Sequence, residues 1–322
     1  MNHKLTVAMG QISPVWLNRE ATLAKMANYL TEAAREGAQL IAFGEALLPG
    51  YPYWLDLING AEFNSEKQKR LYAYYVEQAV DIERGDLTMI QDACAKNKIS
   101  AYVGCIEKTR QRGMSVYCTM VFIDHQGVIQ SSHRKLMPTY EERLAWAPGD
   151  GHGLRVHSVG DFTVGGLNCW ENWIPMARQS LYAQGEQLHV AIWPGNINNT
   201  KDITRFIAKE ARSYVMSVSG LIGLDDVADD LPFAIEIKEA MKERISSSEK
   251  FLSNGGSCIA APDGEWLVEP VIDKECLTLA TIDLSEVMKE RQNFDPAGHY
   301  SRPDVLQLQV NRQRQTTVHF SE

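Results

Sequence analysis

One cysteine in this sequence stands where a nucleophile could be held. Residues 163–175 read TVGGLNCWENWIP, so a short apolar run ends at two glycines and Cys169, and a helix is expected over residues 176–184. This order predicts a strand, a tight turn and a helix, with the cysteine at the turn. A thiol placed there projects from a rigid strand end and could attack an electrophilic carbon. The alternative is a buried structural cysteine, because cysteine usually behaves as a small hydrophobic residue.

Glu45 is a candidate for the base that such a thiol would need. It closely follows the continuous apolar run QLIAF at residues 39–43, which predicts a strand covered on both faces. A carboxylate at the end of a buried strand is either solvated on a loop or held in a pocket. If Glu45 lies within about 3 Å of Cys169, directly or through one water molecule, it could accept the thiol proton.

A positively charged group is expected where another strand ends. The expected strand at residues 128–132 leads into the segment HRKLMPTYEER, which contains Lys135 and Glu142. Lys135 could lower the pKa of the thiol and stabilise the negative charge that develops during attack, with a backbone N–H next to the cysteine as a second donor. The alternative is that the basic cluster forms a solvated face and that Glu142 pairs with Arg134 or Arg143.

Alternating strands and helices are expected to position these groups. Besides the strand that leads to Cys169, strands are expected at residues 5–9, 39–43, 100–107, 118–123, 128–132, 189–193, 220–224, 257–261, 266–269 and 278–282. Helices are expected from Asn18 to about Gly37 and over residues 86–97, 176–184 and 205–218, with an acidic, helix-like surface excursion at 225–250. This alternation predicts an α/β domain with helices on one face of each sheet. Because no linker or repeat interrupts the chain, residues 1–302 are expected to form a single domain and residues 303–322 a C-terminal tail.

The composition excludes several classes of protein. Of the 322 residues, 44% are hydrophobic, which is enough for a sizeable core. A formal net charge of −9 disfavours nucleic acid as a partner, because phosphate binding needs a basic surface. The sequence has no apolar run long enough for a membrane span or a signal peptide, so a cytoplasmic location is expected. The six cysteines contain no C-x-x-C pair and suggest reduced thiols rather than a zinc site or disulfides.

Aromatic side chains gather near the candidate groups. Tyr51 and Trp54 lie in an aromatic segment shortly after Glu45, and Trp170 and Trp173 follow Cys169. Such side chains could form the wall of a substrate pocket with room for an aromatic or extended apolar group. Packing in the core or at a subunit interface is the alternative.

Three segments together resemble the carbon–nitrogen hydrolase (nitrilase) superfamily. They are AFGE at residues 42–45, HRKLMPT at residues 133–139 and NCWEN at residues 168–172. The resemblance extends over nearly the whole chain, in order and at plausible spacing. The CWE sequence at the cysteine, PT and ER within residues 138–143, and GHYSRPD at residues 298–304 are similar to the true nitrilase branch.

The resemblance implies a four-layer α-β-β-α sandwich. It also implies that subunits pair to extend the sandwich, giving a dimer or a larger homo-oligomer that can take the form of a spiral. The C-terminal tail, in which apolar residues alternate over 305–310, is expected at such a subunit interface, as a strand added to a neighbouring subunit. The implied chemistry needs neither a metal ion nor an organic cofactor.

The activity implied by the resemblance is hydrolysis of a small organic nitrile to the carboxylic acid and ammonia. Cys169 is the expected nucleophile, Glu45 the base, Lys135 the positive group and Glu142 a positioning or proton-relay residue. Attack by the thiol would give a thioimidate, which water converts to a thioester and then to the acid. Two carboxylates beside one lysine and a neutral thiol leave one excess negative charge, so we expect a shared proton and a coupled titration.

Other functions remain open at this point. An amidase, a carbamoylase or a cyanide-hydrolysing enzyme could use the same glutamate, lysine and cysteine, and its products would distinguish it from an enzyme acting on organic nitriles. A non-catalytic binding or scaffold protein is a different class, in which the thiol would be inert toward thiol reagents. The motifs do not specify which nitrile is bound.

Overall fold

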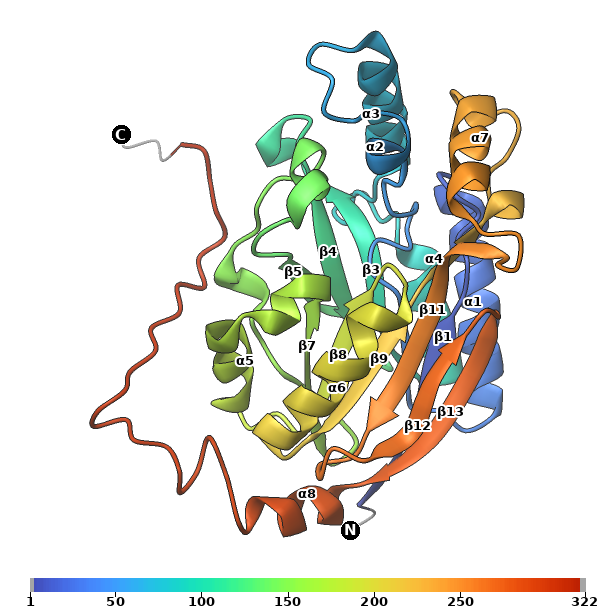
Figure 1. The fold of residues 1–322 in the computed structure, drawn as a ribbon. Coiled ribbons are helices and arrows are strands. Elements are labelled where there is room, and N and C mark those ends of the chain that lie inside the picture. The colour runs from blue at the N-terminus through green and yellow to red at the C-terminus, as the bar shows by residue number, and fades with distance from the viewer. Residues whose placement is uncertain (1–2, 319–322) are drawn as a thin grey trace.

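Two β-sheets packed face to face form the centre of the molecule (Figure 1). The computed structural model describes residues 3–318 of the chain. In spatial order the first sheet contains β13 (Cys276–Asp283), β1 (Lys4–Gln11), β2 (Leu40–Phe43), β3 (Ser100–Lys108), β4 (Val116–Ile123) and β5 (Ile129–Arg134). The second contains β10 (Leu221–Gly223), β11 (Phe251–Ala260), β9 (Tyr214–Ser219), β8 (Leu188–Trp193), β7 (Phe162–Asn168) and β6 (His157–Val159), and β12 (Trp266–Ile272) pairs with β11. Each strand expected from the sequence is present, with small shifts at its ends.

Helices cover the outer face of each sheet and complete four layers. The first sheet is covered by α1 (Arg19–Arg35) and α4 (Thr88–Asn97), and the second by α5 (Pro175–Tyr182) and α6 (Ile197–Ala211). Asn18 caps α1 as predicted, because its side chain accepts a hydrogen bond from the Ala21 N–H. The predicted α-β-β-α sandwich is therefore confirmed. The remaining helices, α2 (Trp54–Leu57), α3 (Glu66–Gln78), α7 (Ala234–Arg244) and α8 (Leu284–Arg291), lie at the ends and edges of the sheets.

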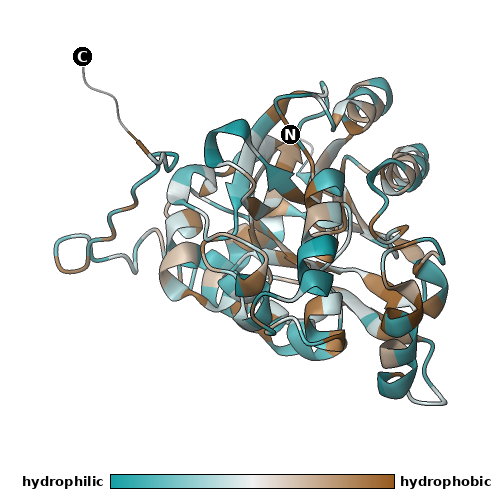
Figure 2. Cartoon of the chain, turned by 90° about the horizontal axis from the view of Figure 1, so that it is seen from above, coloured by the Kyte–Doolittle hydropathy of each residue, from teal (hydrophilic) through white to brown (hydrophobic). Residues whose placement is uncertain are grey.

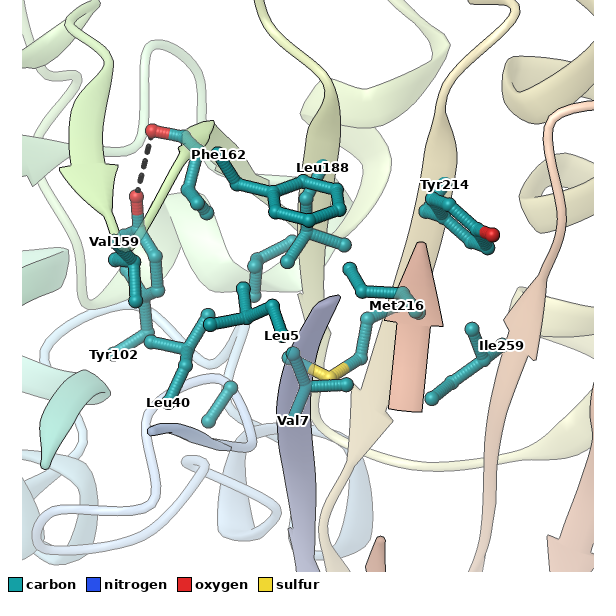
Figure 3. Packing of buried hydrophobic residues seen from close by; sticks show 14 of the residues in the cluster. Leu5, Val7, Leu40, Tyr102, Val159, Phe162, Leu188, Tyr214, Met216 and Ile259 are labelled. Carbon is teal, nitrogen blue, oxygen red and sulfur yellow. Dashed lines mark hydrogen bonds between the residues drawn. The ribbon is translucent and has the colours of Figure 1, made fainter. Parts of the chain in front are cut away.

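The main core lies between the two sheets. In Figure 3, Leu5, Val7 and Leu40 of the first sheet point towards Leu188 and Met216 of the second. In Figure 2 brown, apolar residues are frequent on the central strands, and teal, hydrophilic residues are frequent on the outward faces of the helices. Burial of this apolar surface is what holds the two sheets together.

β2 shows why a continuous apolar run is needed here. Successive side chains of a strand point to opposite faces. Leu40 and Ala42 accordingly join the core between the sheets, whereas Ile41 and Phe43 join the cluster under α1 and α4. All four residues are buried, so a polar residue within this strand would face apolar packing on either side.

The strand directions bring several strand ends to the same edge of the sandwich. β1, β2 and β3 are parallel, and β5 runs in the same direction because two antiparallel pairings separate it from β3. In the second sheet β7, β8 and β9 are parallel. The Glu45 N–H donates to the Trp193 carbonyl at 3.1 Å and thereby joins the end of β2 to the end of β8. The loops after these strands therefore meet in one place.

The helix predicted over residues 205–218 is wrong in its second half. Helix α6 ends at Ala211, and Arg212 adopts a left-handed conformation with φ of 51°. The following residues form β9, which is buried along its whole length. The segment YVMSVS favours a strand through its β-branched residues, and its pairing with β8 and β11 fixes that structure. Helices α2, α3 and α8 were not predicted.

The described part of the tail, residues 303–318, contains neither helix nor strand. It leaves α8 and runs along the side of the molecule that carries α5 and β5 (Figure 1). Its apolar residues Val305 and Leu306 are exposed, while Arg314 binds Asp150 at 3.0 Å. The division into a domain and an interface tail, the strand added to a neighbour and the homo-oligomer stay predictions, and residues 319–322 lie outside the described chain. Among residues 3–318, no helix has the length and apolar character to cross a membrane.

Candidate active site

Cys169 lies at the sharp turn that the sequence predicts. β7 ends at Asn168, and a short 3-10 helix, η4 (Cys169–Trp173), begins at the cysteine itself. Its backbone φ is 48°, a left-handed conformation that costs a residue with a Cβ atom about 1–2 kcal/mol. The side chain is only 3% exposed. Strain of this kind persists only where the surroundings enforce it, which makes position 169 a candidate functional site.

Hydrogen bonds from neighbouring residues hold this turn in place. Asn172 donates through Nδ2 to the Cys169 carbonyl at 2.8 Å and to the Leu167 carbonyl at 3.2 Å. The Glu171 carboxylate accepts the Asn168 N–H at 2.8 Å. All of these groups are buried, so the bonds have no competition from solvent. The strained backbone at the cysteine is therefore fixed from both sides.

The four residues predicted to be catalytic come together in one buried site. Lys135 Nζ lies 2.9 Å from Glu45 Oε1 and 2.7 Å from Glu142 Oε2. A carboxylate oxygen of Glu45, one of Glu142 and the Cys169 sulfur lie within 4.8 Å of one another. Each side chain is almost completely buried. The lysine thus lies between two carboxylates beside a thiol, at the meeting point of β2, β5 and β7.

Glu142 is held by the loop that carries it. It belongs to a 3-10 helix, η2 (Tyr140–Leu144), and its Oε2 accepts the Thr139 N–H at 2.6 Å. Tyr51 donates its hydroxyl to Glu142 Oε1 at 3.0 Å. These bonds leave Glu142 facing Lys135.

The alternative pairing of Glu142 with a neighbouring arginine does not occur. Arg134 instead forms two hydrogen bonds with Glu107, at 2.9 and 2.6 Å. Arg143 donates to the Pro138 carbonyl at 3.0 Å. Glu142 is consequently available to the lysine alone among the nearby cations that the structure describes.

The electrostatics of the site agree with one excess negative charge. Burial raises the pKa of Glu45 to about 7, against the attraction of Lys135, and Glu142 adds to the rise. Burial alone would lower the pKa of Lys135, but Cys169, Glu45 and Glu142 together raise it well above its usual value. The lysine therefore stays charged, and Glu45 carries a proton for part of the time near neutral pH.

The thiol of Cys169 is protonated in this resting arrangement. Burial and the charges of Glu45 and Glu142 raise its pKa well above the usual value. Lys135 and a hydrogen bond from the Trp170 N–H act in the opposite direction, as predicted, but they are outweighed. The proton must therefore be removed as the sulfur attacks, which is a task for the adjacent carboxylate.

A second buried ion pair, missed by the sequence analysis, ties the cysteine turn to the lysine strand. His133 Nε2 lies 3.0 Å from Glu171 Oε1, and the Leu136 N–H donates to the same oxygen at 2.7 Å. Burial alone would raise the pKa of Glu171, but His133 and the two backbone donors lower it. His133 lies in the motif HRKLMPT and Glu171 in NCWEN, so the closeness of each residue to Lys135 or Cys169 in the sequence could have indicated that they belong to the site.

A buried chain of polar groups behind the turn was also missed. His189 on β8 contacts Glu186 Oε1 through Nδ1 at 3.0 Å and Asn172 Oδ1 through Nε2 at 2.7 Å. Asn172 in turn binds the Cys169 carbonyl, and Arg178 donates to the Asn172 carbonyl at 2.7 Å. The chain fixes the orientation of Asn172 and, through it, the backbone of the cysteine. A histidine within an apolar strand gave no sign of this role.

The four aromatic candidates for substrate contact are placed differently from one another. Tyr51 lies at the site and binds Glu142, as described above. Trp54 is 1% exposed and packs against Trp16, with ring centroids 6.3 Å apart, in a cluster that also contains Cys118 and Trp146. Trp170 and Trp173 are 51% and 42% exposed, so much of each ring faces solvent. Contact with substrate stays a prediction for all four.

The cavity beside Glu45 is small. It measures about 10 Å³, close to the space that one water molecule needs. It is lined by Pro14, Glu45, Leu47, Tyr51, Tyr53, Pro194, Gly220 and Leu221.

The spacing of Glu45, Glu142 and Cys169 is short enough for a shared metal ion. The Lys135 ammonium group, however, already contacts an oxygen of each carboxylate. A second cation at this point would be repelled by the first. The arrangement favours an ion-pair site with a thiol over a metal site.

Comparison with known proteins places these residues in a wider context. A family model described as "Carbon-nitrogen hydrolase" matches residues 6–292. The chain is 34% identical to "Nitrilase 2" from an unknown prokaryotic organism, over 99% of this chain and 96% of that protein. It is 35% identical to an "Aliphatic nitrilase" from Rhodococcus rhodochrous, over 98% of this chain and 82% of that protein. The crystal structure of a carbon–nitrogen hydrolase from Helicobacter pylori superposes with a TM-score of 0.69 at 20% identity, covering 94% of this chain and 97% of that one.

Proposed function

Because the chain belongs to the carbon–nitrogen hydrolase family, and to its nitrilase branch, we propose that it hydrolyses a small organic nitrile through a covalent bond to Cys169. The products are the carboxylic acid and ammonia. The observation that carries this proposal is the buried Lys135, which contacts Glu45 and Glu142 beside a strained cysteine. Such a site holds a nucleophile, a base and a positive charge within reach of one small substrate.

The first step is attack of the thiol on the nitrile carbon. Glu45 removes the Cys169 proton as the carbon–sulfur bond forms and passes it to the nitrile nitrogen, which gives a thioimidate and restores the carboxylate. The negative charge that develops on the nitrogen is stabilised by Lys135 and by the Trp170 N–H. Burial strengthens both interactions, because little solvent screens them.

Two water molecules complete the reaction. The first adds to the thioimidate, and loss of ammonia leaves a thioester; the second releases the acid and restores the thiol. Glu45 accepts a proton from each water and passes it on, first to the departing ammonia and then to the Cys169 sulfur, while Glu142 keeps Lys135 in place through the 2.7 Å contact. If the tetrahedral intermediate expels sulfur rather than ammonia, the product is the amide.

Ammonia release from a panel of compounds tests this proposal. The panel contains phenylacetonitrile, benzonitrile, a short aliphatic dinitrile, cyanide and the matching amides. We expect ammonia and acid from at least one organic nitrile, and no turnover by Cys169→Ala in a protein that keeps its fold. Turnover of amides alone would refute nitrile hydrolysis, and an active Cys169→Ala would remove this residue as the nucleophile.

The covalent step and the base can be examined separately. Rapid quenching during turnover should give a protein whose mass is increased by the acyl group of the substrate, and digestion should locate it on Cys169. Glu45→Gln should bind substrate yet lose at least about a hundredfold in rate, because proton transfer contributes about 10²–10⁴-fold. A near-native rate in Glu45→Gln would assign the base to another group.

A further inference from the structure

A second thiol contacts the proposed base. Cys118 lies on β4 with its side chain buried, and its Sγ donates a hydrogen bond to Glu45 Oε1 at 3.4 Å. Lys135 Nζ lies 2.9 Å from the same oxygen. The backbone N–H of Lys135 also donates to the backbone carbonyl of Cys118 at 2.8 Å. The two residues that contact Glu45 Oε1 are therefore direct neighbours across adjoining strands. Neither the proposed nucleophilic attack nor the hydrolysis uses the Cys118 thiol.

The other oxygen of the same carboxylate is free. Glu45 Oε2 is buried and has no hydrogen-bond partner among the described residues. A buried carboxylate oxygen without a partner is costly, and such a group calls for an explanation. One oxygen of the Glu45 carboxylate lies within 4.8 Å of the Cys169 sulfur, so the group with an unoccupied acceptor also borders the thiol whose proton has to be removed.

We propose that Cys118 is a positioning residue for Glu45: its thiol holds one carboxylate oxygen in place so that the other remains free to take the Cys169 proton. This inference rests on the proposed function. The terminal torsion of a glutamate is broad, so a carboxylate can rotate unless it is held by donors. Cys118 and Lys135 both bind Oε1 and so oppose that rotation, which holds the second oxygen in a fixed position as the acceptor.

A thiol suits this task because it stays protonated. Burial and the charge of Glu45 raise the pKa of Cys118 well above its usual value, so it remains a donor near neutral pH. Its hydrogen bond favours the ionised form of Glu45 and lowers the pKa of that carboxyl group, acting alongside Lys135 against burial. The thiol therefore keeps Glu45 in the form that can accept a proton.

Removal of Cys118 should consequently change a pH profile as well as a rate. The titratable groups that face Glu45 are Lys135, Glu142, Cys118 and Cys169, with the phenols of Tyr51, Tyr53 and Tyr75 at longer range. Burial raises the pKa values of the three phenols above their usual value, so they stay neutral across the range of interest. Without the thiol donor, the pKa of Glu45 rises, and the acid limb of activity moves to higher pH.

The test compares Cys118→Ala, Cys118→Ser and the matched control Cys94→Ala. Serine keeps a donor at position 118, and Cys94 is a buried thiol in the cluster under α4, away from the site. In Cys118→Ala, kcat on the nitrile that wild type turns over best should fall about tenfold, with KM little changed. Cys118→Ser should recover most of the rate and the wild-type pH profile, and Cys94→Ala should match wild type.

A second measurement does not depend on nitrile turnover. The rate at which iodoacetamide alkylates Cys169, followed by peptide mass, reports removal of the thiol proton by Glu45. Its pH midpoint should be higher in Cys118→Ala than in wild type and should return in Cys118→Ser. If no nitrile is turned over but this shift is seen, the proposed function fails while the role of Cys118 stands. An unshifted midpoint in Cys118→Ala, or a serine variant as impaired as the alanine variant, would refute the role of Cys118.

Discussion

Replacing Glu45 with glutamine should change how the stability of the protein depends on pH. Burial raises the pKa of Glu45 from 4.5 to about 7, even with Lys135 beside it. A carboxyl group whose folded-state pKa is raised contributes most to stability below its unfolded pKa. That contribution is lost as the pH rises through the folded value. Wild type should therefore lose stability between pH 4.5 and about 7 at this residue, and Glu45→Gln, which cannot ionise, should not.

The size of the effect follows from the shift. At about 1.36 kcal/mol per unit, a rise from 4.5 to about 7 corresponds to about 3 kcal/mol. The charges of Lys135 and Glu142 and the Cys118 hydrogen bond act on the ionisation of Glu45, so some of this free energy is shared with its neighbours. We expect the unfolding free energy of Glu45→Gln, relative to wild type, to improve by about 1–3 kcal/mol between about pH 5 and pH 8.

Urea unfolding of both proteins at about pH 5.5 and pH 8.5, followed by circular dichroism, measures this difference. Glu171→Gln is the matched control, because the pKa of this buried glutamate is lowered by His133 and backbone donors despite its burial. Its contribution to stability is present above its unfolded pKa and is lost as the pH falls through the folded value. Both measurement pH values lie above the unfolded pKa of 4.5, so Glu171→Gln should be destabilised by nearly the same amount at each. The reasoning fails if Glu45→Gln loses stability relative to wild type as the pH rises.

Three further changes have definite expected outcomes. Gly104→Ala would place a Cβ atom 2.1 Å from the Gly44 carbonyl oxygen, so it should cost about 1–3 kcal/mol and lower kcat by displacing Glu45, as urea titration and steady-state kinetics would measure. Asn172→Ala removes the donor that holds the Cys169 carbonyl, so kcat should fall about tenfold or more at similar KM. Arg314→Ala removes bonds to Asp150 and to Ser132, so chymotrypsin should cut the tail faster than in Arg302→Ala, whose guanidinium binds the exposed Asp304. A tail that stays equally resistant to the protease in both arginine variants would contradict the expectation for Arg314→Ala. An unchanged kcat in Gly104→Ala or Asn172→Ala would contradict the expectation for that variant.

The parts of the site that lie at strand ends could be predicted from the sequence. Glu45 and Cys169 each come after an apolar strand, Lys135 comes after the second strand of a hairpin, and strand ends that run in parallel meet at one edge of a sandwich. Burial of β2 on both faces was visible in its unbroken apolar run. The catalytic candidates at strand ends could be predicted because the strand pattern in the sequence agrees there with the strand positions in the fold.

The remaining parts depend on contacts that no local pattern contains. His189 and Glu186 act on the cysteine only through Asn172, and the Cys118 hydrogen bond to Glu45 crosses from β4 to the loop after β2. The helix expected over 205–218 failed because tertiary pairing turned its second half into β9. In each case the deciding partner is far away in the sequence.

The position of β1 has a consequence for biosynthesis. β1 lies between β2 and β13, so one of its edges pairs with the last strand of the chain. During translation that edge stays open from the time residue 11 emerges until residue 283 does, which at about 5–20 residues per second takes tens of seconds. An open strand edge is a template for association with other chains. When the chain is synthesised slowly at a high expression level, more of it should therefore form inclusion bodies. A circular permutant that begins with β13 supplies the partner of β1 at once and should form fewer of them.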